Sequence, residues 1–215
     1  MDSRVDTVCR LIRQRIAEGV YRPAQRLVET ELAKSFGVSR ISVRFALHRL
    51  QQEGLVTIEP RRGATVRVLS LEEAVEIMEI RERLEGMAAE LAAQRITDDD
   101  LAKLARLVEE MEDLLQQGKP MEYSQRNALF HQTIIEAAGH RVLSETLASL
   151  QTPLIRFRFR TILVPGRSEQ SVKEHREILQ ALKAHSPREA EAAMRHHLAN
   201  VRRTMVEAKD LLEIF

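Results

Sequence analysis

Apolar and polar positions alternate with two different periods in the first third of the chain. Over Val5–Glu18 the apolar residues recur every three or four positions, which predicts an amphipathic helix. Tyr21–Gln25 is expected to be a turn or extended connector, because the residue before a proline disfavours helix. After a short second helix and a third at Arg40–Glu53, residues 55–58 and 64–68 carry the β-branched side chains typical of strands. The pattern predicts three helices followed by a two-stranded hairpin.

The turn between the second and third helices has the local chemistry of a helix-turn-helix. Gly37 can take a left-handed conformation at the end of the second helix, and Ser39 can cap the third. The apolar stripe of the third helix, predicted to face a core, consists of Ile41, Val43, Leu47 and Leu50. Arg40, Ser42 and Arg44 project elsewhere, near the helix N-terminus, where such proteins contact base edges and phosphates.

The predicted hairpin has a basic tip. Gly54 ends the third helix, and the segment Pro60–Gly63, which contains Arg61 and Arg62, joins the two strands as a turn. A helix-turn-helix followed by such a hairpin predicts a winged helix-turn-helix that binds double-stranded DNA.

Beyond residue 70 the periodicity is helical throughout, and no further strand is predicted. The helices are expected at about 71–95, 98–117, 121–138, 141–163, 169–185 and 187–213. The breakers Gly118–Pro120 and Val164–Gly166 separate some of them, and Pro153 bends or restarts the fourth. The predicted fold is mainly α: a winged helix-turn-helix at 1–69, then an all-α antiparallel bundle at 70–215.

The charge distribution supports this division. Residues 1–70 hold 13 Lys+Arg and 7 Asp+Glu, a net charge of +6, whereas residues 71–215 hold 20 and 25, a net charge of −5. A basic first domain on an acidic second one favours nucleic-acid contact by the first domain alone.

The cysteine content and the hydropathy of the chain indicate where in the cell the protein is located. The single Cys9 excludes an intramolecular disulfide and fits a reducing cytoplasm. No apolar run is long enough to span a membrane, and the start of the chain does not resemble a signal peptide. The protein is therefore expected to be cytoplasmic, with no membrane partner.

Four polar residues of the bundle could share one site. Asn127 and His131 are four apart in one predicted helix, so they lie on the same face. His175 and His197 lie eleven residues before and after Ser186, so two antiparallel helices joined there would bring them to similar heights. Imidazole is a good ligand for zinc, nickel or iron, and the set is a candidate metal site. The alternative is that these are helix-surface histidines or hydrogen-bonded core histidines.

Arg81 is a candidate anchor for an anionic effector. Its planar guanidinium offers two parallel donors that match a carboxylate. The alternative is a salt bridge with Glu85, four residues on along the same helix.

Together these residues resemble the GntR family of bacterial transcription regulators, in its FadR-like subfamily with an FCD-type C-terminal domain. The first domain resembles the DNA-binding signature of the family over LVETELAKSFGVSRISVRFALHRLQQEGLV and then PRRGATV. The second resembles the FCD pattern at EIRERLE, NALFH, KEHREILQAL and AMRHHL.

The resemblance implies partners as well as a fold. It implies a homodimer that grips operator DNA through Arg40 and Arg44, with Ser39 and Ser42, while Gly63 at the wing tip enters the minor groove. It also implies a small carboxylate metabolite as effector, often bound beside a metal ion. The resulting hypothesis is a dimeric, effector-controlled transcription factor that acts as a repressor.

Two positions depart from the family pattern. The first metal position is usually Asp but is Asn127 here, and an amide oxygen is a neutral, weaker donor than a carboxylate. The residue after Arg44 is often Glu but is Phe45 here, which raises the question of what holds Arg44 in place.

Three other functions fit parts of the sequence. A three-histidine metal site can activate water, so a metal-dependent hydrolytic enzyme is one alternative. It lacks an evident general base or nucleophile, and it leaves the DNA-binding domain unexplained, so no enzymatic activity is expected. The others are a metal-free sensor, in which the same residues bind the effector directly, and an architectural DNA-binding protein that responds to no small molecule.

Overall fold

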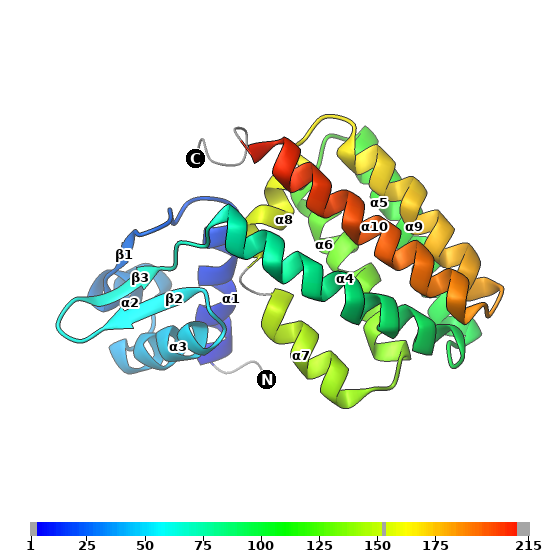
Figure 1. The fold of residues 1–215 in the computed structure, drawn as a ribbon. Coiled ribbons are helices and arrows are strands. Elements are labelled where there is room, and N and C mark those ends of the chain that lie inside the picture. The colour runs from blue at the N-terminus through cyan, green and yellow to red at the C-terminus, as the bar shows by residue number, and fades with distance from the viewer. Residues whose placement is uncertain (1–3, 152–153, 210–215) are drawn as a thin grey trace. The chain divides into compact units, whose positions relative to one another are not determined.

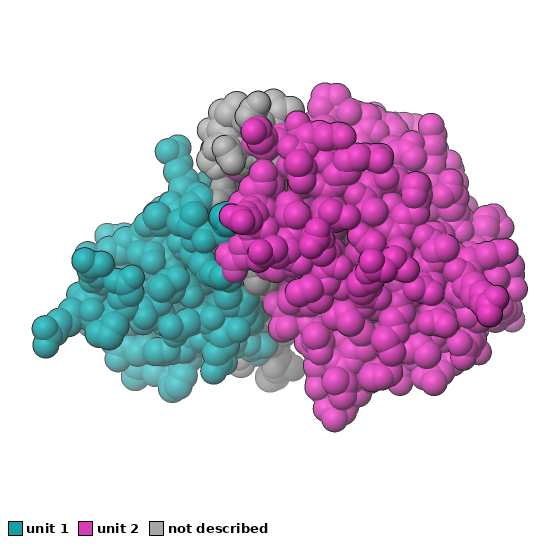
Figure 2. Space-filling view, viewed as in Figure 1, with its two compact units in different colours: residues 1–70, 151–156, 215 teal, residues 71–150, 157–214 magenta. Residues whose placement is uncertain are grey.

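The computed structural model describes residues 4–151 and 154–209. These residues form two compact units, which Figure 2 shows in teal and magenta. The first holds residues 4–70 together with Gln151 and residues 154–156, and the second holds residues 71–150 and 157–209. The first unit is a small α+β domain and the second is helical (Figure 1). The mainly α fold class expected from the sequence, with a winged helix-turn-helix preceding a helical bundle, is confirmed.

The helices of the first unit pack around one apolar core. They are α1 (Arg4–Ala17), α2 (Glu29–Phe36) and α3 (Arg40–Gln52). α1 contributes Val8, Cys9, Ile12 and Ile16, all of which are buried. The spacing of these positions matches one face of an amphipathic helix, as the sequence pattern predicted.

The buried stripe of α3 differs from the predicted one by one residue. It consists of Val43, Ala46, Leu47 and Leu50, at relative positions 0, 3, 4 and 7. Ile41, which was expected to face the core, is 66% exposed. Two residues span about 200° around a helix, so Ile41 lies nearly opposite Val43. Its assignment to the core was wrong.

The sheet of the first unit has one strand more than the sequence predicted. β1 (Arg26–Leu27), β2 (Val56–Glu59) and β3 (Gly63–Val66) form an antiparallel sheet in the order β1-β3-β2. Arg26 pairs with Thr65, and buried Leu27 adds to the core. A two-residue strand is too short to show an alternating pattern, which is why β1 was not predicted.

The second unit is built from the helices that follow residue 70. They are α4 (Leu71–Ala93), α5 (Asp98–Gln116), α6 (Pro120–Ala137), α7 (Arg141–Gln151), α8 (Ile155–Ile162), α9 (Arg167–Lys183) and α10 (Pro187–Glu207). The helix predicted at 141–163 is therefore two helices, and Pro153 lies outside the described residues. Within residues 4–151 and 154–209, no helix combines the length and apolar composition that a membrane span requires.

The helices α4 and α10 pack closely along their length (Figure 1). Gly86 of α4 is fully enclosed at this contact: a Cβ added there would lie 2.6 Å from Cγ of Arg195 and 3.3 Å from Cγ of Glu191. The first distance is shorter than non-bonded carbon–carbon contacts in proteins, so a glycine is needed for steric reasons rather than for its backbone conformation.

Gly86→Ala should lower the free energy of unfolding by about 1–3 kcal/mol, the usual cost of overpacking. Alanine favours helix over glycine by roughly 1 kcal/mol, so any loss of stability must come from the steric contact. Chemical denaturation of wild type and variant measures the difference. In an Arg195→Ala background the same substitution should instead be neutral or stabilising; a loss of equal size there would contradict the steric explanation.

Candidate nucleic-acid interface and metal centre

The start of α3 is fixed by a serine pair. Gly37 takes the left-handed conformation with φ of 64°, which lets the chain leave α2 and turn. Oγ of Ser39 accepts a hydrogen bond from the backbone N–H of Ser42 at 3.1 Å, and the two hydroxyl oxygens lie 2.9 Å apart. This cap orients the first turn of α3, from which the predicted DNA-contacting residues project.

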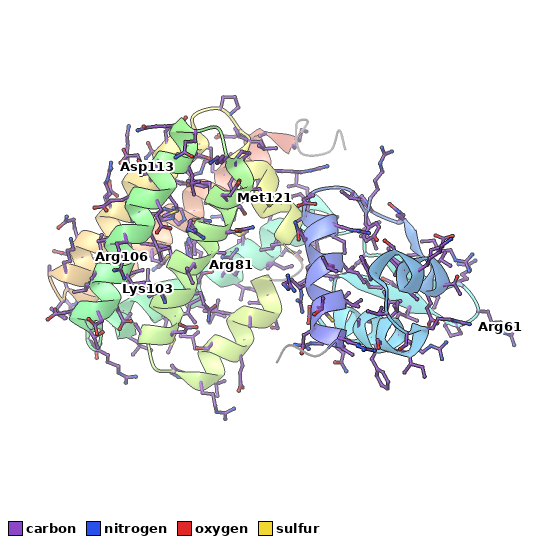
Figure 3. The ribbon with its side chains drawn as sticks, turned by 180° about the vertical axis from the view of Figure 1, so that it is seen from behind. Arg61, Arg81, Lys103, Arg106, Asp113 and Met121 are labelled. Carbon is purple, nitrogen blue, oxygen red and sulfur yellow. The ribbon has the colours of Figure 1, made fainter. Side chains whose placement is uncertain are left out.

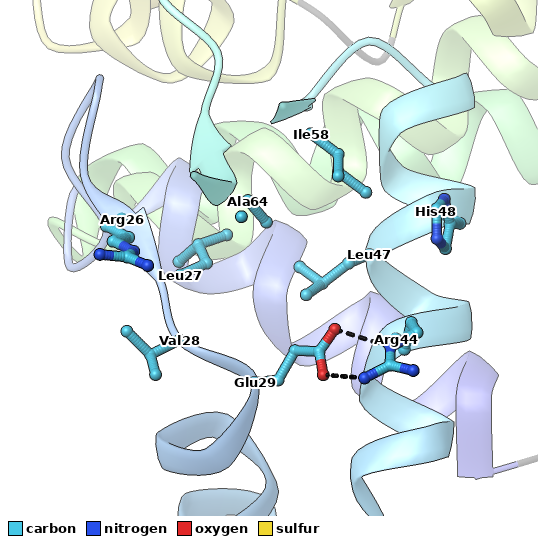
Figure 4. Close-up of a pocket in the computed structure, with 10 residues that line it drawn as sticks. Arg26, Leu27, Val28, Glu29, Arg44, Leu47, His48, Ile58 and Ala64 are labelled. Carbon is cyan, nitrogen blue, oxygen red and sulfur yellow. Dashed lines mark hydrogen bonds and ion pairs between the residues drawn. The ribbon is translucent and has the colours of Figure 1, made fainter. Parts of the chain in front are cut away.

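Arg44 is held by a carboxylate from the neighbouring helix. Its Nε and Nη2 donate to the two oxygens of Glu29 at 2.9 Å and 2.8 Å, a bidentate ion pair (Figure 4). These hydrogen bonds lower the pKa of Glu29, so the pair stays ionised. Arg40 lies 3.8 Å from the same carboxylate. Glu29 thus orients Arg44, and the residue that follows it, Phe45, is not needed for that purpose.

A hollow of about 340 Å³ lies between α3 and the sheet (Figure 4). Arg26, Arg44 and His48 contribute polar side chains to its lining, Glu29 adds the carboxylate that pairs with Arg44, and Leu47 and Ile58 are apolar. The hollow is open and includes residues of α3. With two arginines against one carboxylate, its lining suits the phosphate backbone of a nucleic acid bound along that helix.

The tip of the β2–β3 hairpin exposes two arginines. Arg61 takes a left-handed conformation with φ of 66°, Gly63 follows with φ of 83°, and Arg62 contacts Glu59 at 3.2 Å. Arg61 extends from the end of the hairpin (Figure 3). The predicted contact residues of the wing are therefore exposed together at one tip, as Ser39, Arg40 and Arg44 are at the start of α3.

Arg44→Ala should weaken binding to a specific DNA site by about 10- to 100-fold, the value of a good base or phosphate contact by arginine. Fluorescence anisotropy with labelled duplex, repeated at several salt concentrations, measures the change. Arg10→Ala removes an equally charged, exposed side chain from α1 and serves as the control. Equal losses in the two variants would show that only net charge matters and that α3 is not the reading helix.

Three histidines converge in the interior of the second unit. His131 comes from α6, His175 from α9 and His197 from α10, and each residue is at most 5% exposed. One ring nitrogen from each lies within 4.8 Å of the others. The rings of His175 and His197 have centroids 4.6 Å apart, so the predicted alignment across the turn at Ser186 is present.

Two of these histidines are oriented by buried carboxylates. Nδ1 of His131 lies 2.7 Å from Glu85, and Nδ1 of His197 lies 2.7 Å from Glu174. An ionised carboxylate can only accept a hydrogen bond, so each Nδ1 carries the proton and each Nε2 keeps its lone pair. Carboxylate–histidine pairs of this kind fix ring orientation at protein metal sites.

The remaining donor atoms have no protein partner. Both ring nitrogens of His175 and Oδ1 of Asn127 are buried without a hydrogen bond among the described residues. A buried polar atom that makes no hydrogen bond costs about 1–3 kcal/mol, so such atoms call for a ligand. The three imidazoles fit a divalent transition metal, and these residues would hold it. Asn127, one helical turn before His131 on α6, stays a predicted fourth ligand.

The electrostatics keep His175 and His197 neutral and the two carboxylates ionised. Burial, reinforced by His197 and His131, lowers the pKa of His175 well below its ordinary value. Burial lowers the pKa of His197 to about 4 against the opposing hydrogen bond to Glu174. Burial alone would raise the pKa of Glu85, but Arg81 and His131 outweigh it and lower that pKa to about 2. Neutral imidazole is the form that binds a metal.

Arg81 is fully engaged within the protein. Its Nε and Nη2 donate to one oxygen of Glu85 at 2.8 Å and 2.5 Å, and its Nη1 contacts the sulfur of Met78 at 3.3 Å. The residue is 6% exposed and lies inside the helical unit (Figure 3). The salt bridge considered as the alternative is present, so in this structure Arg81 supports His131 through Glu85. Contact with an effector stays a prediction.

The sequence did not predict that His197 is oriented by an ion pair, as His131 is. Arg167 donates to Glu174 through Nη1 at 3.1 Å and Nη2 at 2.6 Å, and Asn200 donates to Glu174 at 2.8 Å. Each of the two carboxylates is therefore held by a buried arginine and in turn orients a histidine. The available signal was weak: Glu174 directly precedes His175, and Arg167 lies two turns before Glu174 on the same helix.

Comparison with protein families gives two matches that together span most of the chain. Residues 4–66 match the family described as bacterial regulatory proteins, gntR family, and residues 76–200 match the FCD domain. The order of the two matches is that of the two units of the structure.

Individual proteins are similar over nearly the whole length. An uncharacterized HTH-type transcriptional regulator, YdhC of Bacillus subtilis, is 30% identical over 94% of this chain and 89% of its own. The HTH-type transcriptional repressor RspR of Escherichia coli is 26% identical over 90% and 85%. Among solved structures, McbR/YncC of E. coli has a TM-score of 0.79 at 27% identity and covers 99% of this chain and 98% of its own.

Proposed function

Since this chain belongs to the GntR family of bacterial DNA-binding transcriptional regulators and carries an FCD domain, we propose that it is a repressor controlled by a small carboxylate bound beside a metal ion. Its relatives and its fold neighbours are transcriptional regulators, and this chain is likewise a regulator and not an enzyme. The observation that carries the proposal is the buried cluster of His131, His175 and His197 in the same chain as the exposed helix α3.

The polar cluster supports the sensory half of the proposal. Asn127 and His175 present unpartnered donor atoms, while His131 and His197 are oriented by Glu85 and Glu174. A metal ion held there would supply a positive charge to which a carboxylate can bind, since carboxylate oxygens are ligands of divalent cations. The metal-free alternative, in which the histidines hydrogen-bond the effector directly, differs in one respect: it needs no metal for the response.

The geometry of DNA recognition favours a dimer, and the name of one relative favours repression. A single reading helix such as α3 contacts only a few base pairs, so family members of this type gain specificity by binding two half-sites with two copies. We infer a homodimer on a palindromic operator, with the Arg61–Gly63 tip in the adjacent minor groove. The word repressor in the name of the E. coli relative RspR supports the sign of regulation. The effector would act by favouring one arrangement of the two reading helices over another.

The test combines DNA binding with a ligand screen. The full-length protein should prefer its own promoter DNA over random duplex by at least 1000-fold at moderate salt, as specific regulators do. A thermal-shift screen of small carboxylates, with and without added zinc or nickel, should find compounds that raise the melting temperature and release the protein from DNA. Equal binding to promoter and random DNA would overturn the proposed function as a sequence-specific regulator. Release of the protein from DNA by a carboxylate in the absence of metal would favour the alternative of a metal-free sensor.

A further inference from the structure

The exposed face of α3 carries two large apolar side chains. Ile41 is 66% exposed and Phe45 is 63% exposed, and the two lie one helical turn apart on the same face. Arg40 and Arg44, also one turn apart, form the adjacent stripe. The core needs neither apolar residue, because the buried stripe of α3 begins at Val43 on the opposite side.

An apolar pair in this position is unusual for a surface helix. Single exposed apolar residues are common, but two on neighbouring turns of one face indicate a contact that is made in a complex. The flanking cations Arg40 and Arg44 and the net charge of +6 on residues 1–70 oppose burial against another protein of similar charge and favour a polyanion. The partner that fits both features is DNA.

The major groove offers one apolar group to such a pair. Of the four bases, only thymine presents a methyl group there, and apolar side chains contact it. The first turns of a recognition helix are the part that reaches the base edges, and Ile41 and Phe45 lie in the first two turns of α3. Resting on the DNA-binding function stated above, we propose that Phe45 and Ile41 read thymine methyl groups and make thymine a specificity determinant of each operator half-site.

The same pair should reject other bases. Cytosine and adenine present amino groups in the major groove, and an apolar side chain pressed against an amino group leaves that donor without a partner. Phe45 therefore selects by two effects, a gain with the thymine methyl and a penalty with a polar edge. A carboxylate side chain at position 45 would instead accept from the amino group of cytosine and repel phosphate, so the apolar Phe45 determines what this part of the helix can read.

The test removes the methyl group and nothing else. A binding site is first selected from a random duplex pool with the full-length protein, and each thymine of one half-site is then replaced by deoxyuridine. At one or two positions this replacement should weaken binding about fourfold, which corresponds to ~0.8 kcal/mol for one buried methyl group. Phe45→Ala should bind thymine and deoxyuridine sites equally well, and its own selected sites should lose the preference for thymine at those positions.

Val20→Ala is the matched control, because Val20 is 56% exposed in the same unit but lies outside α3. This variant should keep the full sensitivity to deoxyuridine. If a sequence is selected but no deoxyuridine replacement changes the affinity, or if Phe45→Ala keeps the wild-type sensitivity, the proposal that α3 reads thymine methyl groups is overturned, while the proposed regulatory function is unaffected. If no sequence is enriched from the pool, the proposed regulatory function and the methyl-reading proposal are both overturned.

Discussion

Arg81→Met should lower the free energy of unfolding by about 3–5 kcal/mol, the usual cost of removing one partner from a buried ion pair. The guanidinium is the counter-charge of Glu85, a fully buried carboxylate. Without Arg81, the carboxylate must either remain ionised with only His131 beside it or take up a proton, and both cost free energy. Urea denaturation of the metal-free protein, followed by circular dichroism, measures the loss.

Two further variants separate the ion pair from simple loss of packing. Glu85→Gln in the Arg81→Met background removes the charge that was left unpaired and keeps a hydrogen-bond acceptor for His131, so it should restore much of the stability. Arg141→Met breaks an exposed pair with the same spacing, Arg141–Glu145, and should cost no more than about 0.5 kcal/mol. A similarly small cost for Arg81→Met would show that its guanidinium is free, as direct effector binding requires.

The parts of the fold that the sequence predicted are those set by local chemistry. Gly37 and Ser39 define a turn and a cap through backbone conformation and one hydrogen bond, and both are where the local pattern placed them. The strand β1 was missed because two residues are too few to show an alternating pattern. Ile41 was misplaced for a different reason: it was grouped with Val43, although two residues apart on a helix lie nearly opposite each other.

For the candidate metal site, the sequence predicted the positions of the ligands but not the carboxylates that orient them. Asn127 and His131 share a helix face by their spacing alone, and the turn at Ser186 aligns His175 with His197. The supporting carboxylates were not equally accessible. Glu85 was visible only as a helix neighbour of Arg81, and its bond to His131 spans 46 residues and arises from the packing of α4 against α6. Supports of this kind become evident only from the folded chain.

The two arginine–carboxylate–histidine chains, Arg81–Glu85–His131 and Arg167–Glu174–His197, explain how a buried polar cluster can persist in an apolar bundle. Each ionised group in a chain has a counter-charge within hydrogen-bond distance, which offsets much of its desolvation cost. His175 has no such support, and its ring contacts those of both other histidines. It is therefore the residue whose environment is least satisfied without a ligand and the most informative one to change.

Zinc or nickel added to the chelator-treated protein should raise its melting temperature, and His175→Ala should abolish that rise. A ligand at a free concentration one hundredfold above its dissociation constant stabilises by ~2.7 kcal/mol, which is roughly 5–11 °C for a chain of this size. The readout is the difference with and without metal, so any loss of stability from the substitution itself cancels. His48→Ala removes an exposed histidine of α3 and should keep the full rise.

Replacing the neutral amide of Asn127 with a carboxylate should strengthen the response to metal, whereas His175→Ala should abolish it. Asn127→Asp should lower the melting temperature of the metal-free protein, because it places an unpaired carboxylate where Oδ1 is buried. With metal added it should gain more than the wild type, since an ionised oxygen is a stronger donor to a divalent cation than an amide oxygen. Titration with each metal, followed by thermal shift and by metal content after desalting, measures both changes. If the wild type and Asn127→Asp both lack any metal-dependent rise, the cluster is no metal site, which leaves direct effector binding or a structural role for the histidines.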